Sequence, residues 1–241
     1  MRLRTALLSA ATLIVLAVPA AAQNVTGFYI GGAAGMNWLG DQGGTTSPTV
    51  ASTNTGYDNG LGLLAALGYG YGSGWRSELE FNHRKNDTDS VSRNGTALTS
   101  PGGDGKHLGV FGNALYDFSL GLPVTPYLGA GLGWVRSSAK ISGGGVQVTD
   151  DSDNLIGYQL IAGLALPIAS QLKLTFDYRF MSTFSRPEYS TTAAYQAVAA
   201  GQNTLKVDRP ENHGVFLGLR YEFGAPARPM PAAAPAPAPM P

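Results

Sequence analysis

The sequence predicts an all-β fold, an eight-stranded antiparallel transmembrane up-and-down β-barrel with long extracellular loops and a disordered C-terminal tail. Three observations predict it: an N-terminal export signal, eight segments in which apolar residues recur at every second position, and connections that are alternately short and long. A chain of 241 residues is long enough for one such domain with short accessory segments.

The composition excludes several classes of protein. Charged residues make up 13% of the chain, roughly half of their share in an average soluble domain. Lysine and arginine together number 16, and so do aspartate and glutamate, so no basic excess indicates a nucleic-acid partner. The chain has no cysteine, which excludes disulfides, thiol catalysis and cysteine-bound metals.

The first 22 residues have the three parts of a secretory signal peptide. Arg2 and Arg4 form its positive region, residues 6–18 are apolar, and small residues precede the expected cleavage between Ala22 and Gln23. The apolar stretch is short for a membrane span, although an N-terminal anchor helix is the alternative interpretation. No later stretch of 18 or more apolar residues predicts a transmembrane helix. The mature chain is therefore either a soluble protein or a transmembrane barrel. Besides the α-helix, a closed β-barrel is the only structure that pairs all backbone N–H and C=O groups in lipid.

Residues 25–223 contain eight segments with a period of two, separated by stretches rich in Gly, Ser, Thr, Asn and Asp. In residues 75–84, Trp75, Leu79 and Phe81 share one face and charged residues occupy the other. Residues 172–180 and 214–223 repeat this pattern. In the other five segments glycine takes many positions of the second face; they are residues 28–38, 60–71, 107–118, 127–134 and 157–166. We therefore assign residues 23–223 to the barrel.

The connections distinguish a transmembrane barrel from a soluble sandwich. The short ones are residues 72–74, 120–124 and 167–170, and the long polar ones are residues 40–59, 87–105, 139–153 and 185–212. Strict alternation is typical of short periplasmic turns and long outer loops, and aromatic residues gather near both ends of the predicted strands, as in interfacial girdles. These features predict an integral outer-membrane protein with extracellular loops and periplasmic termini.

The second face of the strands predicts a charged barrel interior. An eight-stranded barrel is just wide enough for its own side chains, and buried charges need partners because their desolvation is unfavourable. The predicted network balances five basic against five acidic residues, Arg76, Arg84, Lys173, Arg179 and Arg220 with Glu78, Glu80, Asp117, Asp177 and Glu222. Asn82, Asn113 and Gln159 supply further hydrogen-bonding groups. We interpret this set as a structural plug, and a gated pore whose ion pairs exchange partners is the alternative.

Three segments resemble a known group of proteins. Residues 27–32 read Gly-Phe-Tyr-Ile-Gly-Gly, residues 126–133 read Pro-Tyr-Leu-Gly-Ala-Gly-Leu-Gly, and residues 176–180 read Phe-Asp-Tyr-Arg-Phe. In this order and spacing they resemble the small outer-membrane β-barrel proteins related to the OmpA N-terminal domain, and in particular their alphaproteobacterial surface-antigen branch. The resemblance covers about residues 25–223 and implies the same barrel fold and a place in the cell envelope.

The resemblance also implies an assembly signal at the last strand. Gly218, Tyr221 and Phe223 match the C-terminal signal that the outer-membrane assembly machinery reads, although Phe216 stands where a polar residue is usual. Residues 224–241 follow and are dominated by proline and alanine, which predicts an extended periplasmic tail without a core. In OmpA-like proteins a similar linker leads to a peptidoglycan-binding domain, which we do not carry over to this chain.

Other candidate sites are weaker. His83, His107 and His213 are expected near strand ends, which raises a metal or haem hypothesis, but polar rim residues are the simpler interpretation. No His-x-Ser pattern or G-x-S-x-G elbow indicates a lipid A-modifying enzyme. The cluster of Asp150, Asp151 and Asp153 lacks the spacing of an EF-hand calcium loop and is interpreted as part of a solvated loop.

The sequence thus predicts a non-enzymatic envelope protein with a structural and surface-antigen role, without a cofactor or metal, whose loops are available to external partners. Expected partners are outer-membrane lipid and lipopolysaccharide, the barrel assembly machinery, periplasmic chaperones and, through the tail, the cell wall. Two alternatives stay open: a narrow porin-like channel for ions or small solutes, and a lipid A-modifying enzyme.

Overall fold

A computed structural model of the protein describes residues 24–48 and 50–223. The predicted signal peptide with its cleavage site at Ala22 and Gln23, and the predicted tail, lie outside the described residues. Within the described part of the chain, no helix is both long enough and apolar enough to span a membrane.

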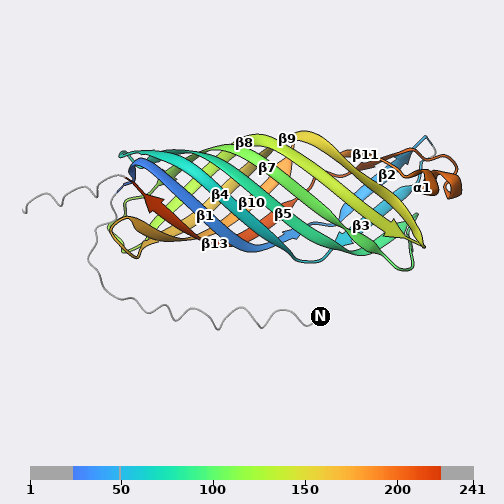
Figure 1. Cartoon of the computed structure of the whole chain (residues 1–241), viewed down its shortest axis with the longest axis horizontal. Coiled ribbons are helices and arrows are strands. Elements are labelled where there is room, and N and C mark those ends of the chain that lie inside the picture. The colour runs from blue at the N-terminus through green and yellow to red at the C-terminus, as the bar shows by residue number, and fades with distance from the viewer. Residues whose placement is uncertain (1–23, 49, 224–241) are drawn as a thin grey trace, which may run out of the picture.

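Eight long strands form a closed antiparallel barrel (Figure 1). In the order of the ring they are β1 (Thr26–Leu39), β4 (Gly60–Tyr71), β5 (Trp75–Arg93), β7 (Gly102–Asp117), β8 (Thr125–Gly143), β9 (Val146–Pro167), β10 (Leu172–Thr183) and β13 (Asn212–Glu222). The ring closes between β1 and β13, where Gly31 lies opposite Arg220. The predicted eight-stranded barrel is confirmed.

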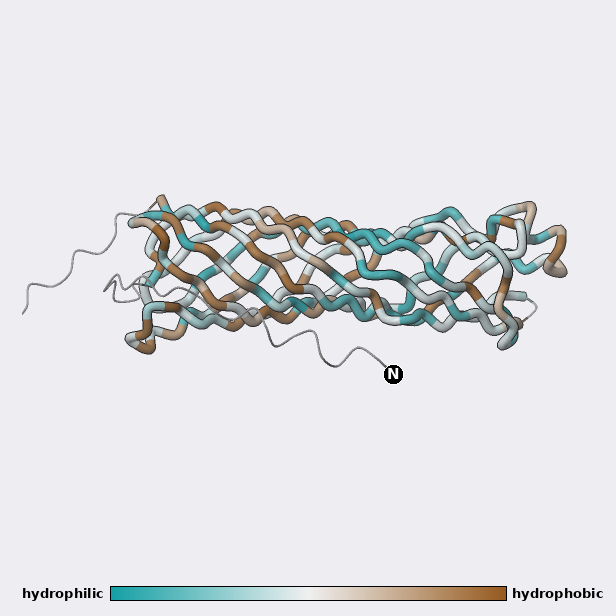
Figure 2. The backbone as a smooth tube through the Cα atoms, turned by 90° about the horizontal axis from the view of Figure 1, so that it is seen from below, coloured by the Kyte–Doolittle hydropathy of each residue, from teal (hydrophilic) through white to brown (hydrophobic). Residues whose placement is uncertain are grey.

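Side chains alternate between the outside and the inside of the barrel, as the pleat of a strand requires. On β1, Phe28 is 60% exposed and the next residue, Tyr29, is completely buried. Exposed apolar side chains continue this outward phase on all eight strands, and we call them the apolar belt. Figure 2 shows that hydrophobic residues are concentrated in the half of the barrel with the short connections, whereas the other half is mostly hydrophilic, and the exposed apolar side chains of the belt belong to the first half. We call these halves the turn end and the loop end.

The long connections are more ordered than the sequence predicts. The predicted loops at residues 87–105 and 139–153 are wrong, because β5, β7, β8 and β9 continue through them as paired strands. Two tight turns make this possible: Asn94 and Gly95 have φ angles of 49° and 77°, and Gly144 and Gly145 have φ angles of 63° and 78°. Two consecutive residues with positive φ match the right-handed twist of a hairpin, so the strands pair up to the turn.

The other two predicted loops, residues 40–59 and 185–212, also contain secondary structure. They contain β2 (Gln42–Ser47), β3 (Ser52–Tyr57), β11 (Glu188–Ser190), α1 (Ala193–Val198) and β12 (Thr204–Val207). The short strand β6 (Thr96–Ala97) lies instead in residues 87–105 and pairs with β5. Within residues 185–212, α1 is a helix of six residues. Its N-cap is Thr192, whose side chain accepts a hydrogen bond from the Tyr195 backbone N–H.

These segments extend the barrel wall beyond the apolar belt. From β5 the pairing runs through β3, β2 and β12 to β11, and a bridge between Thr149 and Thr191 returns it to β9. The extension encloses its own apolar core, and α1 packs there through Tyr195. The core comprises Val91, Ala139, Ile141, Val148, Tyr189, Tyr195, Ala199, Leu205 and Val207.

The acidic cluster lies in this extension, on β9 rather than in a solvated loop. The Asp151 carboxylate accepts the backbone N–H of Ser190 at 2.8 Å, and the Asp153 carboxylate accepts that of Glu188 at 3.1 Å. Two carboxylates of β9 therefore attach β11 to β9 by side-chain hydrogen bonds, because the backbones of these two strands do not pair along their length.

Acidification should loosen this attachment. The Ser190 N–H lowers the pKa of Asp151 below its ordinary value of 3.8. The interaction is therefore fully present above that value and is lost as the pH falls through the lower pKa of the folded state. Limited proteolysis of residues 186–207 should therefore accelerate as the pH falls below 3.8, the ordinary value of an aspartate. Asp151→Asn should accelerate it already at neutral pH, unlike Asp150→Asn on the same strand. Equal cleavage of the two variants would contradict the role of Asp151.

Candidate functional site: the charged barrel interior

Inward positions of four barrel strands carry the ten charged residues that the sequence places in the interior. None of these side chains is more than 14% exposed. They come from β5, β7, β10 and β13, and β1, β8 and β9 add uncharged polar groups between them. Nine of the ten are joined in two clusters stacked along the barrel axis, and the tenth, Arg84, lies apart.

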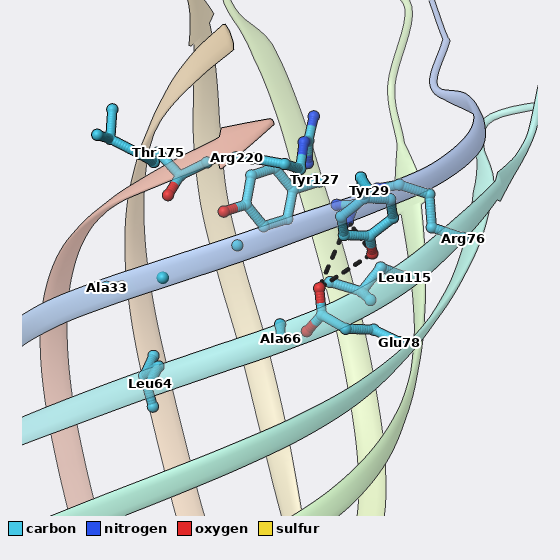
Figure 3. A pocket seen from close by; sticks show the side chains of 13 residues that line it. Tyr29, Ala33, Leu64, Ala66, Arg76, Glu78, Leu115, Tyr127, Thr175 and Arg220 are labelled. Atoms are coloured by element: carbon cyan, nitrogen blue, oxygen red, sulfur yellow. Dashed lines mark hydrogen bonds and ion pairs between the residues drawn. The ribbon is translucent and has the colours of Figure 1, made fainter. Parts of the chain in front are cut away.

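The first cluster, at the turn end, centres on Arg76. Its guanidinium holds both carboxylate oxygens of Asp117 at 2.9–3.0 Å through Nε and Nη2. Nη1 donates to the Tyr29 hydroxyl at 2.8 Å, and this hydroxyl donates to Glu78 at 3.0 Å (Figure 3). The rings of Tyr29 and Tyr127 lie 5.3 and 5.2 Å from the guanidinium carbon. Each of the three guanidinium nitrogens of Arg76 thus donates a hydrogen bond within the protein.

Arg220 continues this cluster toward the end of the barrel. Its Nη2 lies 4.0 Å from Asp117, and its Nε donates to Glu222 at 3.0 Å. Lys173 on the neighbouring strand β10 lies 3.0 Å from the same Glu222 oxygen. Three cations therefore share three carboxylates, Glu78, Asp117 and Glu222, in the turn-end half.

The second cluster centres on Glu80 and Arg179, which form a buried ion pair. Arg179 also contacts Asp177 at 3.5 Å, and Asp177 accepts a hydrogen bond from the Tyr127 hydroxyl. Asn82 and Gln159 donate to Glu80 Oε1 at 3.1 and 3.2 Å.

Asn113 connects the two clusters. Its side-chain amide donates to Glu78 at 3.2 Å in the first cluster and to Glu80 at 3.1 Å in the second. It also accepts from Gln159 at 2.8 Å. The three amides named from the sequence, Asn82, Asn113 and Gln159, therefore all hydrogen-bond within the network.

Arg84 departs from the predicted balance. It is completely buried, yet no carboxylate of the described residues lies within ion-pair distance of it. It donates weakly to the Asn212 backbone carbonyl at 3.4 Å and lies over the Phe216 ring at 5.5 Å. The five carboxylates are already shared among four cations, so equal numbers of opposite charges do not ensure that each one is paired.

The interior leaves little open space. A cavity of about 40 Å³ lies beside β1 and β4, lined by Tyr29, Arg76, Glu78, Tyr127 and Arg220 among others (Figure 3). A space of this size holds a few water molecules at most. Closer to the loop end, Phe111, Val135 and Met181 form a small apolar cluster inside the barrel.

The residues of the predicted assembly signal lie at the end of β13. Tyr221 and Phe223 point outward, with their ring centroids 5.1 Å apart in an edge-to-face arrangement. Gly218 faces inward, where a Cβ atom would lie 2.7 Å from the Gly32 carbonyl oxygen and from Ala33 Cβ. Close packing of β13 against β1 therefore requires glycine at this position.

The three histidines do not converge. His107 is buried inside the barrel, where its Nδ1 lies 3.2 Å from the Asn212 amide. His83 is on the outward face of β5. His213 is on the outward face of β13, hydrogen-bonded to the Tyr178 hydroxyl at 2.7 Å and stacked near Trp38. Within residues 24–48 and 50–223, no group of three His, Asp or Glu side chains is arranged to hold a metal ion.

Tyr29 and Tyr127 lie in the predicted strands 28–38 and 127–134, on the face rich in glycine, and the sequence alone assigns them no role. In the structure they are the contacts that link arginines to carboxylates in both clusters. The sequence feature that could have identified them is their position in the alternation, because each is a large aromatic residue on a face that otherwise carries mostly glycine.

Removing Arg76 should destabilise the barrel, because Asp117 would remain buried without its main partner. Arg76→Ala should lower the free energy of unfolding by about 3–5 kcal/mol, measured by denaturant titration in detergent micelles. Asp117→Ala combined with Arg76→Ala should cost less than the sum of the two single changes. Lys206→Ala, at an exposed position, is the control. Additive effects, or no effect of Arg76→Ala, would refute a structural network.

Comparison with known proteins agrees with this architecture. Residues 8–223 match the family described as outer membrane protein beta-barrel domain. An outer membrane protein of Gluconacetobacter diazotrophicus is 31% identical over 92% of this chain, which spans 64% of the length of that relative. OprG of Pseudomonas aeruginosa is similar in structure, with a TM-score of 0.54 and 16% identity over 83% of this chain and 98% of its own.

Two further solved structures share the fold. Neisserial surface protein A has a TM-score of 0.50 and 19% identity over 83% of this chain and all of its own. The outer membrane protease OmpT of Escherichia coli has a TM-score of 0.51 and 7% identity over 81% of this chain and 97% of its own. Likeness at these identities concerns the fold and not the activity. With its closed ring, its apolar belt and the family match over most of its length, the chain belongs to the outer membrane protein β-barrel family and is an integral outer-membrane protein.

Proposed function

We propose that the protein is a non-conducting structural barrel of the cell envelope that presents its loop end as a surface antigen, available for binding external partners. The observation that carries this proposal is the filling of the interior at successive levels. The two charged clusters occupy the half inside the apolar belt, and the apolar core with Tyr189 and Tyr195 fills the extension. A solute moving along the axis would have to displace paired charges and then an apolar core.

The orientation of the barrel is part of the same proposal. Short connections at one end and a large folded extension at the other favour the arrangement in which turns face the periplasm and the extension faces outside. We further propose that the assembly machinery recognises the outward aromatic residues Tyr221 and Phe223 at the turn end. In this orientation the termini face the periplasm. We therefore also propose that periplasmic chaperones bind the chain before insertion and that the tail contacts the cell wall.

Conductance tests the filled interior. The purified barrel should show no discrete current steps in planar lipid bilayers, because Arg76, Arg179 and their carboxylates obstruct it. A shift in mobility between unboiled and boiled samples on a gel shows that the same preparation is folded. Discrete steps that change in size on charge reversal at Glu80 or Arg179 would instead support the narrow channel for ions or small solutes.

Surface labelling tests the orientation. A short epitope inserted between Gly144 and Gly145, in the exposed turn between β8 and β9, should be accessible to antibody on intact cells. The same epitope inserted at Gly121, in the short turn between β7 and β8, should become accessible only after the outer membrane is permeabilised. The reverse pattern would place the loop end in the periplasm. All three glycines have positive φ in open positions, so both turns should tolerate insertion.

A further inference from the structure

Three cations lie on one side of the barrel where the apolar belt ends toward the loop end. On β8, Arg136 is the first outward residue after Trp134, and on β7, Lys106 is the first outward residue beyond Leu108. On β5, Lys85 is the second outward residue after Phe81. The side chains of Lys85 and Lys106 are 45% and 48% exposed, so these charges meet the solvent beside the membrane.

The strand register brings the three cations together. Lys85 lies directly opposite Lys106. Lys106 pairs with Ser138, which places Arg136 diagonally across from it on β8. Like charges directly opposite each other on one face of an antiparallel pair repel. An anion bound between them would convert this repulsion into attraction.

The neighbouring aspartates do not neutralise the positive charge of the cluster on its membrane-facing side. Asp87 lies 3.0 Å from Lys85 and Asp104 lies 2.8 Å from Lys106, and these two aspartates are themselves opposite each other, one rung farther from the belt. Charge is therefore separated along the barrel axis, with the cations on the membrane side. Arg136 forms no ion pair with any described residue and donates instead to the Ser152 hydroxyl at 2.8 Å.

The remainder of the rim has a different character. On β1, β13 and β10 the corresponding outward positions carry Trp38, His213 and Phe180, where the His213 ring stacks on Trp38 and meets Phe180 at a tilt. Aromatic side chains of this kind contact the lipid interface without selecting a charge. The cation cluster is thus confined to the side formed by β5, β7 and β8.

We propose that Lys85, Lys106 and Arg136 bind the phosphates of an outer-leaflet glycolipid whose headgroup carries more than one phosphate. The cluster spans three strands, or about 10 Å at the usual strand spacing, which is wider than one phosphate. Basic side chains at the headgroup level attract anionic lipid, and the apolar belt directly beneath them contacts the acyl chains. The assignment to the outer leaflet rests on the orientation proposed above.

Lipid retention by the folded full-length barrel tests this site. Native mass spectrometry from neutral detergent would follow titration with bisphosphorylated lipid A, monophosphorylated lipid A, cardiolipin and phosphatidylglycerol. The wild-type protein should retain bisphosphorylated lipid A most tightly. The triple variant Lys85→Gln, Lys106→Gln, Arg136→Gln should retain it roughly 10- to 100-fold more weakly.

A second triple variant serves as a matched control. Lys140→Gln, Arg186→Gln and Lys206→Gln remove the same charge from exposed residues of the extension, farther from the belt, that pair with Asp150, Asp208 and Glu188. This variant should bind lipid A like the wild type. Equal weakening in both variants would show a general effect of net charge and overturn the site.

Two other outcomes would also overturn the proposal. Retention of cardiolipin as tightly as bisphosphorylated lipid A would contradict a glycolipid site, and equal retention of phosphatidylglycerol would contradict the need for more than one phosphate. Gel mobility and conductance of the same preparations report separately on the closed barrel, and the epitope experiment reports on its orientation. Failure of the lipid site is therefore distinguishable from failure of the proposed function.

Discussion

Closure of the backbone hydrogen-bond ring between β1 and β13 is the constraint on which the other features depend. In lipid, an unpaired backbone N–H or C=O has no water to replace its partner, so a sheet that crosses a membrane must have no open edge. Closure with eight strands leaves an interior that side chains alone can fill. Because the strands alternate, every residue between two outward apolar side chains must point into this narrow space.

The interior charges follow from that geometry. Polar side chains that cannot face lipid have to satisfy one another, and the bidentate contact of Arg76 with Asp117 is the most complete example. Glycine on neighbouring strands makes room for these long side chains: a Cβ at Gly68 would collide with the Tyr29 ring, and one at Gly163 with Tyr127 and Asp177. The glycines that made the alternation less distinct in the sequence therefore leave the space that the large interior side chains of neighbouring strands occupy.

The sequence predicted the barrel and its inward residues because both depend on a local pattern with a period of two. It did not predict which carboxylate meets which cation, because that depends on strand register, and the solitary position of Arg84 is a result of register. It also underestimated the extension. Asn94-Gly95 and Gly144-Gly145 are hairpin signals in the sequence, but the polar, glycine-rich strands around them resemble loops when only apolar alternation is considered.

The extension explains why an otherwise minimal barrel has strands as long as β9, with 22 residues. About 9–11 residues of a tilted strand suffice to cross the hydrocarbon region, so half of β9 serves another purpose. It pairs with β8 and holds β11 through Asp151 and Asp153, so that the segments between the barrel strands are supported by hydrogen bonds and an apolar core. A surface supported in this way loses less conformational entropy on binding a partner than a flexible loop would. The same continuous strands carry Lys85, Lys106 and Arg136 at a defined height above the belt, which three mobile loops could not do.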